Sequence, residues 1–237
     1  MGWRCLHIGC CLAVFLSIAM ATHGQLRYQR WGGGVDDEPL HFGFSFHYIN
    51  ADYKFDLKEN WRELGYTQVT SPFSHNVGLG LLADAKLTEN LNLRLQPNLR
   101  FMNIHVKMFN GGNLVNKDHS NIHRSDIGIP LLLKFKSDRK TNMRGYLIGG
   151  GELAFNASSA KRYDRSKDIM TTRSYLAYTA GIGFDIYFEY FKMSPEIRWV
   201  QSIGNMLDDD PKNTFNVNDS PIQRLYMRSF QVSLYFE

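Results

Sequence analysis

The sequence predicts an all-β fold, an eight-stranded antiparallel up-and-down transmembrane β-barrel. Three observations support this prediction: long segments of alternating apolar and polar residues, an alternation of long and short connections, and many aromatic residues without a second long apolar run. Phe, Tyr and Trp make up 14% of the 237 residues, while the mean hydropathy is −0.32. Transmembrane strands alternate apolar residues that face the lipid with polar residues that face the lumen, so their mean hydropathy is close to neutral. Membrane-spanning helices are apolar throughout and do not give such a value.

Residues 1–24 are expected to be a cleaved signal peptide. Arg4 is the one Lys, Arg, Asp or Glu before residue 25, and an apolar stretch runs from Leu6 to Ala21. The tripeptide Ala19-Met20-Ala21 matches the small-x-small cleavage rule, and a cut after Gly24 is also possible. The apolar stretch is short for a membrane span, so an uncleaved anchor is the less favoured alternative.

All three cysteines, Cys5, Cys10 and Cys11, lie inside the expected signal peptide. The mature chain therefore has neither disulfides nor cysteine-ligated metal. Gly9-Cys10 resembles a lipoprotein cleavage site, but apolar residues continue beyond it, so lipidation is not favoured. Residues 25–39 are expected to form a flexible periplasmic N-terminal lead, and residues 40–237 the barrel.

Eight segments show the period-two alternation of strands with two unlike faces. In the clearest segment, Leu91, Leu93 and Leu95 alternate with Asn92 and Arg94. Several segments reach the 9–11 residues that a transmembrane strand needs. The strands are expected at about residues 41–55, 73–87, 91–101, 127–135, 144–156, 175–188, 191–203 and 229–236.

Two strands depart from strict alternation. In the first, Phe42–Tyr48 places its aromatic residues on one face, whereas Tyr53 and Phe55 fall on the opposite one. This change predicts a β-bulge near residues 49–51. In the fifth, Gly149–Gly151 blurs the pattern and leaves the register open.

The connections predict how the barrel is placed. Long polar connections alternate with short ones, as in outer-membrane barrels with long external loops and tight periplasmic turns. An even number of strands then places both termini in the periplasm, and the outer wall contacts outer-membrane lipids. A soluble lipocalin-like barrel, with its apolar face inward, is the main alternative. The long connections are residues 56–72, 107–126, 157–173 and 204–224; the short ones are 88–90, 137–142 and 189–190.

Charged residues fall at positions that the alternation turns toward the lumen. An eight-stranded barrel has an interior filled by side chains, so these charges are expected to pair with one another as a structural plug. A proton or ion path is the functional alternative. The candidate residues are Asp84, Arg94, Arg100, Asp185, Glu196 and Arg198, with Lys86 and Lys134 on the same face.

Nothing in the sequence predicts catalysis, a cofactor or a metal site. His119 and His123 have a zinc-like spacing but no third ligand, and Asp208–Asp210 lacks the ordered spacing of a calcium loop. Both are interpreted as solvated loops. The net charge of +4 is too mild and dispersed for nucleic-acid binding. The protein is therefore expected not to be an enzyme.

Three expected strands contain motifs of a known kind, Ile127–Phe135 (IGIPLLLKF), Gly181–Asp185 (GIGFD) and Met193–Trp199 (MSPEIRW). The first is similar to a strand shared by many Bacteroidetes outer-membrane barrels. The second and third together are more specific, and they resemble a pair of strands in the PorT family of these barrels. The resemblance covers about residues 40–237. One departure is that Glu237 follows the aromatic Phe236, where the usual assembly signal ends in an aromatic residue.

The resemblance implies a non-enzymatic role in type IX secretion, the export of proteases or gliding adhesins, with other secretion-system proteins as partners. The barrel would then be an accessory or scaffold rather than the conduit. The alternative is a general outer-membrane barrel that binds an external ligand or surface through its long loops. Secretion by a deletion strain discriminates between the two.

Overall fold

The structure is a computed structural model that describes Trp31 and residues 38–115, 121–158, 168–213 and 215–237. The expected signal peptide and most of the N-terminal lead lie outside these residues. Within them, no helix is long and apolar enough to cross a membrane.

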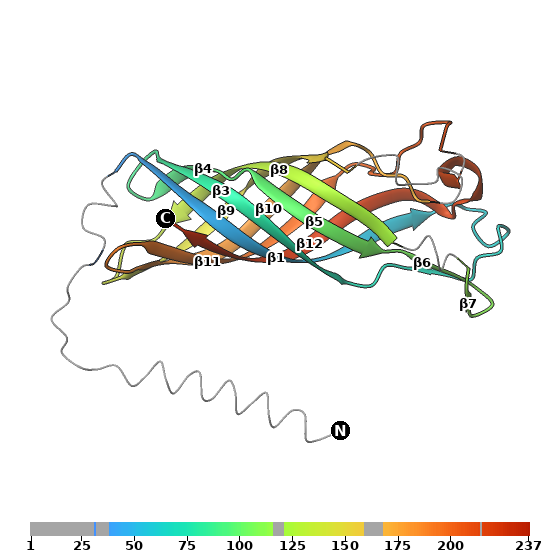
Figure 1. Cartoon of the computed structure of the whole chain (residues 1–237), viewed down its shortest axis with the longest axis horizontal. Helices are drawn as coiled ribbons and strands as arrows, with labels where there is room; N and C mark the ends of the chain where they lie inside the picture. The colour runs from blue at the N-terminus through green and yellow to red at the C-terminus, as the bar shows by residue number, and fades with distance from the viewer. Residues whose placement is uncertain (1–30, 32–37, 116–120, 159–167, 214) are drawn as a thin grey trace, which may run out of the picture. The chain divides into compact units, whose positions relative to one another are not determined.

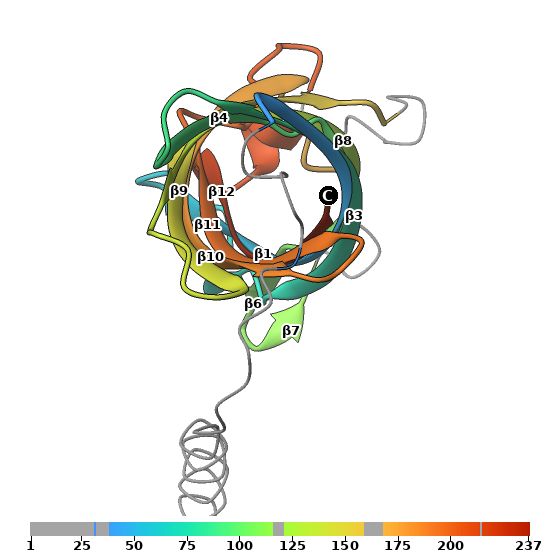
Figure 2. The same cartoon turned by 90° about the vertical axis from the view of Figure 1, so that its left-hand side faces the viewer.

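The main chain forms a closed ring of antiparallel strands, confirming the predicted fold class (Figures 1 and 2). The ring contains nine strand segments in eight positions, because β4 and β5 share the position between β3 and β8. β1 pairs with both β3 and β12, which closes the ring. The segments are β1 (Leu40–Leu57), β3 (Ser74–Lys86), β4 (Leu91–Leu95), β5 (Asn98–His105), β8 (Asn121–Lys136), β9 (Met143–Asn156), β10 (Ser174–Tyr187), β11 (Lys192–Ile203) and β12 (Ile222–Phe236).

The expected third strand is interrupted at Gln96-Pro97, between β4 and β5. Proline has no backbone N–H to donate to a neighbouring strand, so it weakens the ladder locally. The ring stays closed there, since Leu81 N donates to Pro97 O at 2.9 Å and Gln96 N donates to Pro130 O at 3.2 Å.

The connections are short at one end of the barrel and long at the other. The turns β3–β4, β8–β9 and β10–β11 lie at the same end as the C-terminus (Figure 1). The long connections at the other end contain β2 (Gln68–Thr70), β6 (Lys107–Asn110), β7 (Asn113–Leu114) and the π-helix η4 (Phe215–Asp219). The expectation of one loop over residues 107–126 is therefore wrong, because β8 already begins at Asn121 and pairs with β5 there.

The outer wall is apolar over the part of the barrel that adjoins the short turns. In most strands the residues that point outward are exposed or half-buried, while the residues between them point inward and are largely buried. This arrangement contradicts the lipocalin-like alternative, in which the wall would be polar. Exposed wall residues include Phe42, Phe44, Phe46, Leu79, Leu81, Leu131, Leu133, Phe135, Ile182 and Phe184.

The predicted bulge in the first strand is absent. β1 pairs without interruption with β3 and β12 through residues 49–51, and its one register shift falls between Asp56 and Leu57. Ile49 and Tyr53 point inward and are 0% and 2% exposed, while Lys54 points outward and is exposed. The strand itself is regular. The apolar residues change faces along it because the interior of the barrel is apolar around Ile49 and Tyr53.

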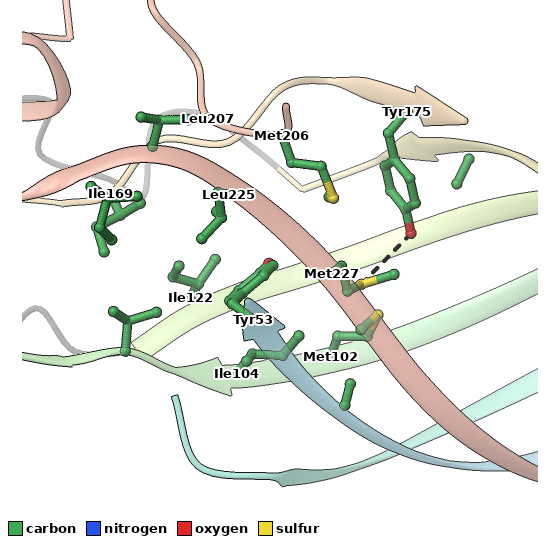
Figure 3. Packing of buried hydrophobic residues seen from close by; sticks show 14 of the residues in the cluster. Tyr53, Met102, Ile104, Ile122, Ile169, Tyr175, Met206, Leu207, Leu225 and Met227 are labelled. Atoms are coloured by element: carbon green, nitrogen blue, oxygen red, sulfur yellow. Dashed lines mark hydrogen bonds between the residues drawn. The ribbon is translucent and has the colours of Figure 1, made fainter. Parts of the chain in front are cut away.

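An apolar core fills the barrel near the long connections (Figure 3). Ile104 from β5, Leu225 and Met227 from β12, and Met206 after β11 are each completely buried. The barrel is therefore polar inside and apolar outside near the short turns, with an apolar interior near the loops. Other members of the core labelled in Figure 3 are Tyr53, Met102, Ile122, Ile169, Tyr175 and Leu207.

Candidate functional site

The interior near the short turns holds the charged side chains that the sequence assigns to the lumen. Each of the six is at most 2% exposed. They come from five different strand segments, each of which turns alternate residues inward. The six are Asp84, Arg94, Arg100, Asp185, Glu196 and Arg198.

Arg94 on β4 meets three carboxylates. Its Nε and Nη2 donate to Asp84 Oδ2 at 2.8 and 2.5 Å. Its Nη1 lies 3.7 Å from Glu196 Oε2, and Nη2 lies 3.3 Å from Glu237 Oε1. The guanidinium carbon also lies 5.3 Å from the ring centroid of Tyr235, within cation–π range. Arg94 thus ties together side chains from β3 and β11 and the C-terminal residue.

Arg198 on β11 extends the same network across the barrel. Its Nε donates to Glu196 Oε1 at 2.9 Å, and its Nη2 donates to Gln96 Oε1 at 2.7 Å and to the Tyr235 hydroxyl at 2.8 Å. The Tyr146 hydroxyl donates to the second oxygen of Glu196 at 2.9 Å. The Glu196 carboxylate is therefore bound through both oxygens.

Two lysines complete the network near the short turns. Lys134 Nζ lies 2.7 and 2.8 Å from the two oxygens of Asp185, which also accepts from Ser194 Oγ at 2.7 Å. Lys192 Nζ lies 2.7 Å from Glu237 Oε2. The Glu237 side chain is 1% exposed, so the residue after the aromatic Phe236 acts as a lumen counter-ion.

Arg100 belongs to a second network, closer to the apolar core. Its Nη2 lies 2.5 Å from Glu152 Oε1 and donates to the Tyr175 hydroxyl at 3.3 Å. That hydroxyl donates to Asp126 Oδ2 at 3.1 Å, and Arg124 Nε donates to Asp126 Oδ1 at 3.1 Å.

The two networks balance in charge. Among the described residues, the ion pairs inside the barrel join six cations to six carboxylates. A buried charge without a partner is very costly, whereas a buried charge beside an opposite one is tolerated. The pairing therefore accounts for the buried charges without an ion path through the barrel. The cations are Arg94, Arg100, Arg124, Lys134, Lys192 and Arg198; the carboxylates are Asp84, Asp126, Glu152, Asp185, Glu196 and Glu237.

Sequence reasoning missed several members of these networks. Arg124 and Asp126 were assigned to a loop, and Glu152 lies in the strand whose register the glycines left open. Tyr235 could have been found, because it continues the inward positions of Ser229 and Ser233 on the same strand.

A buried serine–histidine contact also lies in the lumen. His47 Nε2 is 2.9 Å from Ser45 Oγ, and His47 Nδ1 is 2.7 Å from Ser233 Oγ. The three residues are at most 5% exposed. A nucleophile must be reached by its substrate, so this burial favours a structural role for the contact.

The candidate metal ligands do not come together in the part of the chain that the structure describes. His123 lies on β8 with an exposed side chain, and His119 lies outside the described residues. Asp208 and Asp210 accept backbone hydrogen bonds within their own turn. No group of three or more His, Cys, Asp or Glu side chains suited to a metal ion occurs among the described residues.

Comparison with protein families decides the class of barrel. The sequence signature of the outer membrane protein beta-barrel domain family matches residues 36–208, from just before β1 to beyond β11. The chain belongs to this family. The protein therefore lies in the outer membrane, and the apolar outer wall of its barrel contacts the lipids there.

Solved structures of small outer-membrane proteins resemble this barrel at low sequence identity. OprG from Pseudomonas aeruginosa is 13% identical, with 84% of this chain and 94% of that chain covered and a TM-score of 0.46. Neisserial surface protein A is 10% identical, with 84% and 98% covered and a TM-score of 0.45. The outer-membrane protease OmpT from Escherichia coli is 10% identical, with 83% and 94% covered and a TM-score of 0.43. Curated protein sequences gave no match.

Proposed function

We propose that this barrel is an accessory component of type IX protein secretion, as its resemblance to the PorT family implies. In this role it is required for export of proteases or adhesins and acts as a scaffold, without enzymatic activity. The observation that carries the scaffold role is the filled interior. Paired charges occupy the barrel near the short turns, and an apolar core occupies it near the loops.

A scaffold must act through its outer surfaces. A secreted protein cannot pass through side chains packed to this extent, so contacts with other secretion proteins must involve the wall, the turns or the loops. The β10–β11 turn is a candidate contact, because Tyr190 is 89% exposed and the rings of Phe188 and Phe191 stack at 4.7 Å beside it. Exposed aromatic residues are enriched in protein interfaces.

Deletion of the gene tests the secretion role, with comparison of the secreted proteins before and after complementation. We expect loss of protease or adhesin export, restored by the wild-type gene. Unchanged export would contradict the proposal.

Two further measurements test the scaffold mechanism. Purified barrel in a planar bilayer should show no large steady conductance. A photo-crosslinking residue at Tyr190, or at Asp209 in a long loop, should trap a larger outer-membrane or periplasmic protein. Stable nanosiemens-scale openings would favour a pore instead.

A second candidate function is the binding of an external ligand through the long loops. The observation that favours it is a cavity with charged and polar residues at the loop end of the barrel, between the start of β8, the end of β9 and the connections that precede β10 and follow β11. Normal secretion by the deletion strain together with altered uptake or adhesion would support this function.

A further inference from the structure

A cavity of about 390 Å³ opens at the end of the barrel that carries the long connections. It lies between the start of β8, the end of β9 and the segments that precede β10 and follow β11. Ile122 and Ile169, which also belong to the apolar core, line the cavity, and so does Met170. Cavities of this size suit small organic ligands.

Charges of both signs line this cavity. Arg124 and Arg173 are basic, and Asp208 and Asp210 are acidic. No ion pair among the described residues joins either arginine to either aspartate; Arg124 instead pairs with Asp126. Backbone hydrogen bonds fix the two aspartates. Asp208 Oδ1 accepts from Asp210 N at 3.2 Å, and Asp210 Oδ1 accepts from Lys212 N at 2.9 Å. Opposite charges therefore share one cavity without neutralising each other directly.

Arg124 also has an unused donor. The residue is 2% exposed, its Nε donates to Asp126 at 3.1 Å, and its Nη1 donates to Thr171 Oγ1 at 2.6 Å. Its Nη2 is buried without a hydrogen-bond partner among the described residues. Leaving such a donor unsatisfied costs free energy, which an acceptor oxygen supplied by a ligand recovers.

We propose that this cavity binds a small zwitterion of the α-amino-acid type with an apolar side chain. The carboxylate faces Arg124 and Arg173, the ammonium group faces Asp208 and Asp210, and the apolar side chain contacts Ile122, Ile169 and Met170. This site does not depend on the secretion role, so failure of the binding experiment leaves that role untouched.

Four matched compounds test the ligand class by calorimetry on the purified mature barrel in detergent micelles. Leucine carries both charges, leucinamide only the positive one, N-acetyl-leucine only the negative one, and N-acetyl-leucinamide neither. We expect leucine to bind about tenfold or more tightly than each of the others, as one lost charge-assisted hydrogen bond implies. Absence of leucine binding, or equal affinity for the uncharged compound, overturns the proposal.

Single substitutions then assign the charges. In Arg173→Gln, leucine should lose most of its advantage over leucinamide, because the carboxylate partner is removed. In Asp208→Asn, leucine should lose its advantage over N-acetyl-leucine instead. Asp209→Asn is the matched control, since Asp209 is exposed between the two cavity aspartates and does not line the cavity. Equal losses in Asp208→Asn and Asp209→Asn would show a general charge effect and reject the site.

Discussion

Buried ion pairs in the lumen make single charged residues sensitive to substitution. Asp185 is surrounded by Lys134 and Ser194, so Asp185→Ala leaves the Lys134 ammonium group without its carboxylate. Breaking a buried pair from one side costs about 3–5 kcal/mol, whereas replacing both partners with apolar residues is often neutral.

We therefore expect Asp185→Ala to lower the free energy of unfolding strongly and Lys134→Met/Asp185→Leu to restore much of it. Urea unfolding in detergent micelles, followed by circular dichroism, measures both effects. Asp138→Asn in the exposed β8–β9 turn is the control and should change little. A double variant as unstable as the single one would show that the pair itself stabilises the barrel.

Alternation along a strand was sufficient to place charges such as Asp84 and Arg198 in the lumen. It could not identify their partners, because pairing depends on which strands are neighbours across the barrel and how far each side chain reaches. Glu237 illustrates this limit, since its role follows from the position of Arg94 and Lys192, more than 40 residues away in each case.

Individual strands cross two environments, and the same substitution should therefore cost different amounts along one strand. Leu131 and Ser125 both face outward on β8, Leu131 within the apolar wall and Ser125 six residues closer to the loops. Arginine on the lipid face costs about 2–4 kcal/mol at the bilayer midplane and about 0–1 kcal/mol near the interface.

We expect Leu131→Arg to destabilise the barrel refolded in lipid vesicles clearly more than Ser125→Arg does. The difference in unfolding free energy between these variants is the quantity to measure. Equal costs would place the membrane boundary elsewhere on β8.

Strand identity and approximate length could be read from alternation, but environment could not. Tyr53 and Phe55 change parity relative to Phe42–Tyr48, which favoured a bulge when a constant environment was assumed. The register of β1 is regular, and the interior instead becomes apolar from Ile49 onward. A rule that fixes one face as polar along the whole strand misreads such a change as a backbone irregularity.

At the scale of the whole molecule, the alternation of long and short connections predicts orientation. The loops near Asp209 should be external and the turn at Glu89 periplasmic. Single cysteines at these positions can be treated with an impermeant reagent on intact cells, because Cys5, Cys10 and Cys11 all lie in the expected signal peptide. We expect labelling at Asp209→Cys and none at Glu89→Cys until the outer membrane is disrupted. The reverse result would mean that the barrel is inserted the other way.

The ring has a seam between β1 and β12, where Phe44 lies opposite Phe236. Nearly the whole barrel sequence separates these two strands, so their pairing has a large loop-closure entropy and forms slowly. The seam cannot close until the last strand has been delivered to the membrane. Before that moment the incomplete sheet has two open edges, one on β1 and one on the strand added last. Both edges have unpaired backbone groups, so the chain needs protection from pairing with other chains. Delivery of β12, fifteen residues long, is thus the step that turns an open sheet with a tendency to aggregate into a closed barrel without exposed edges.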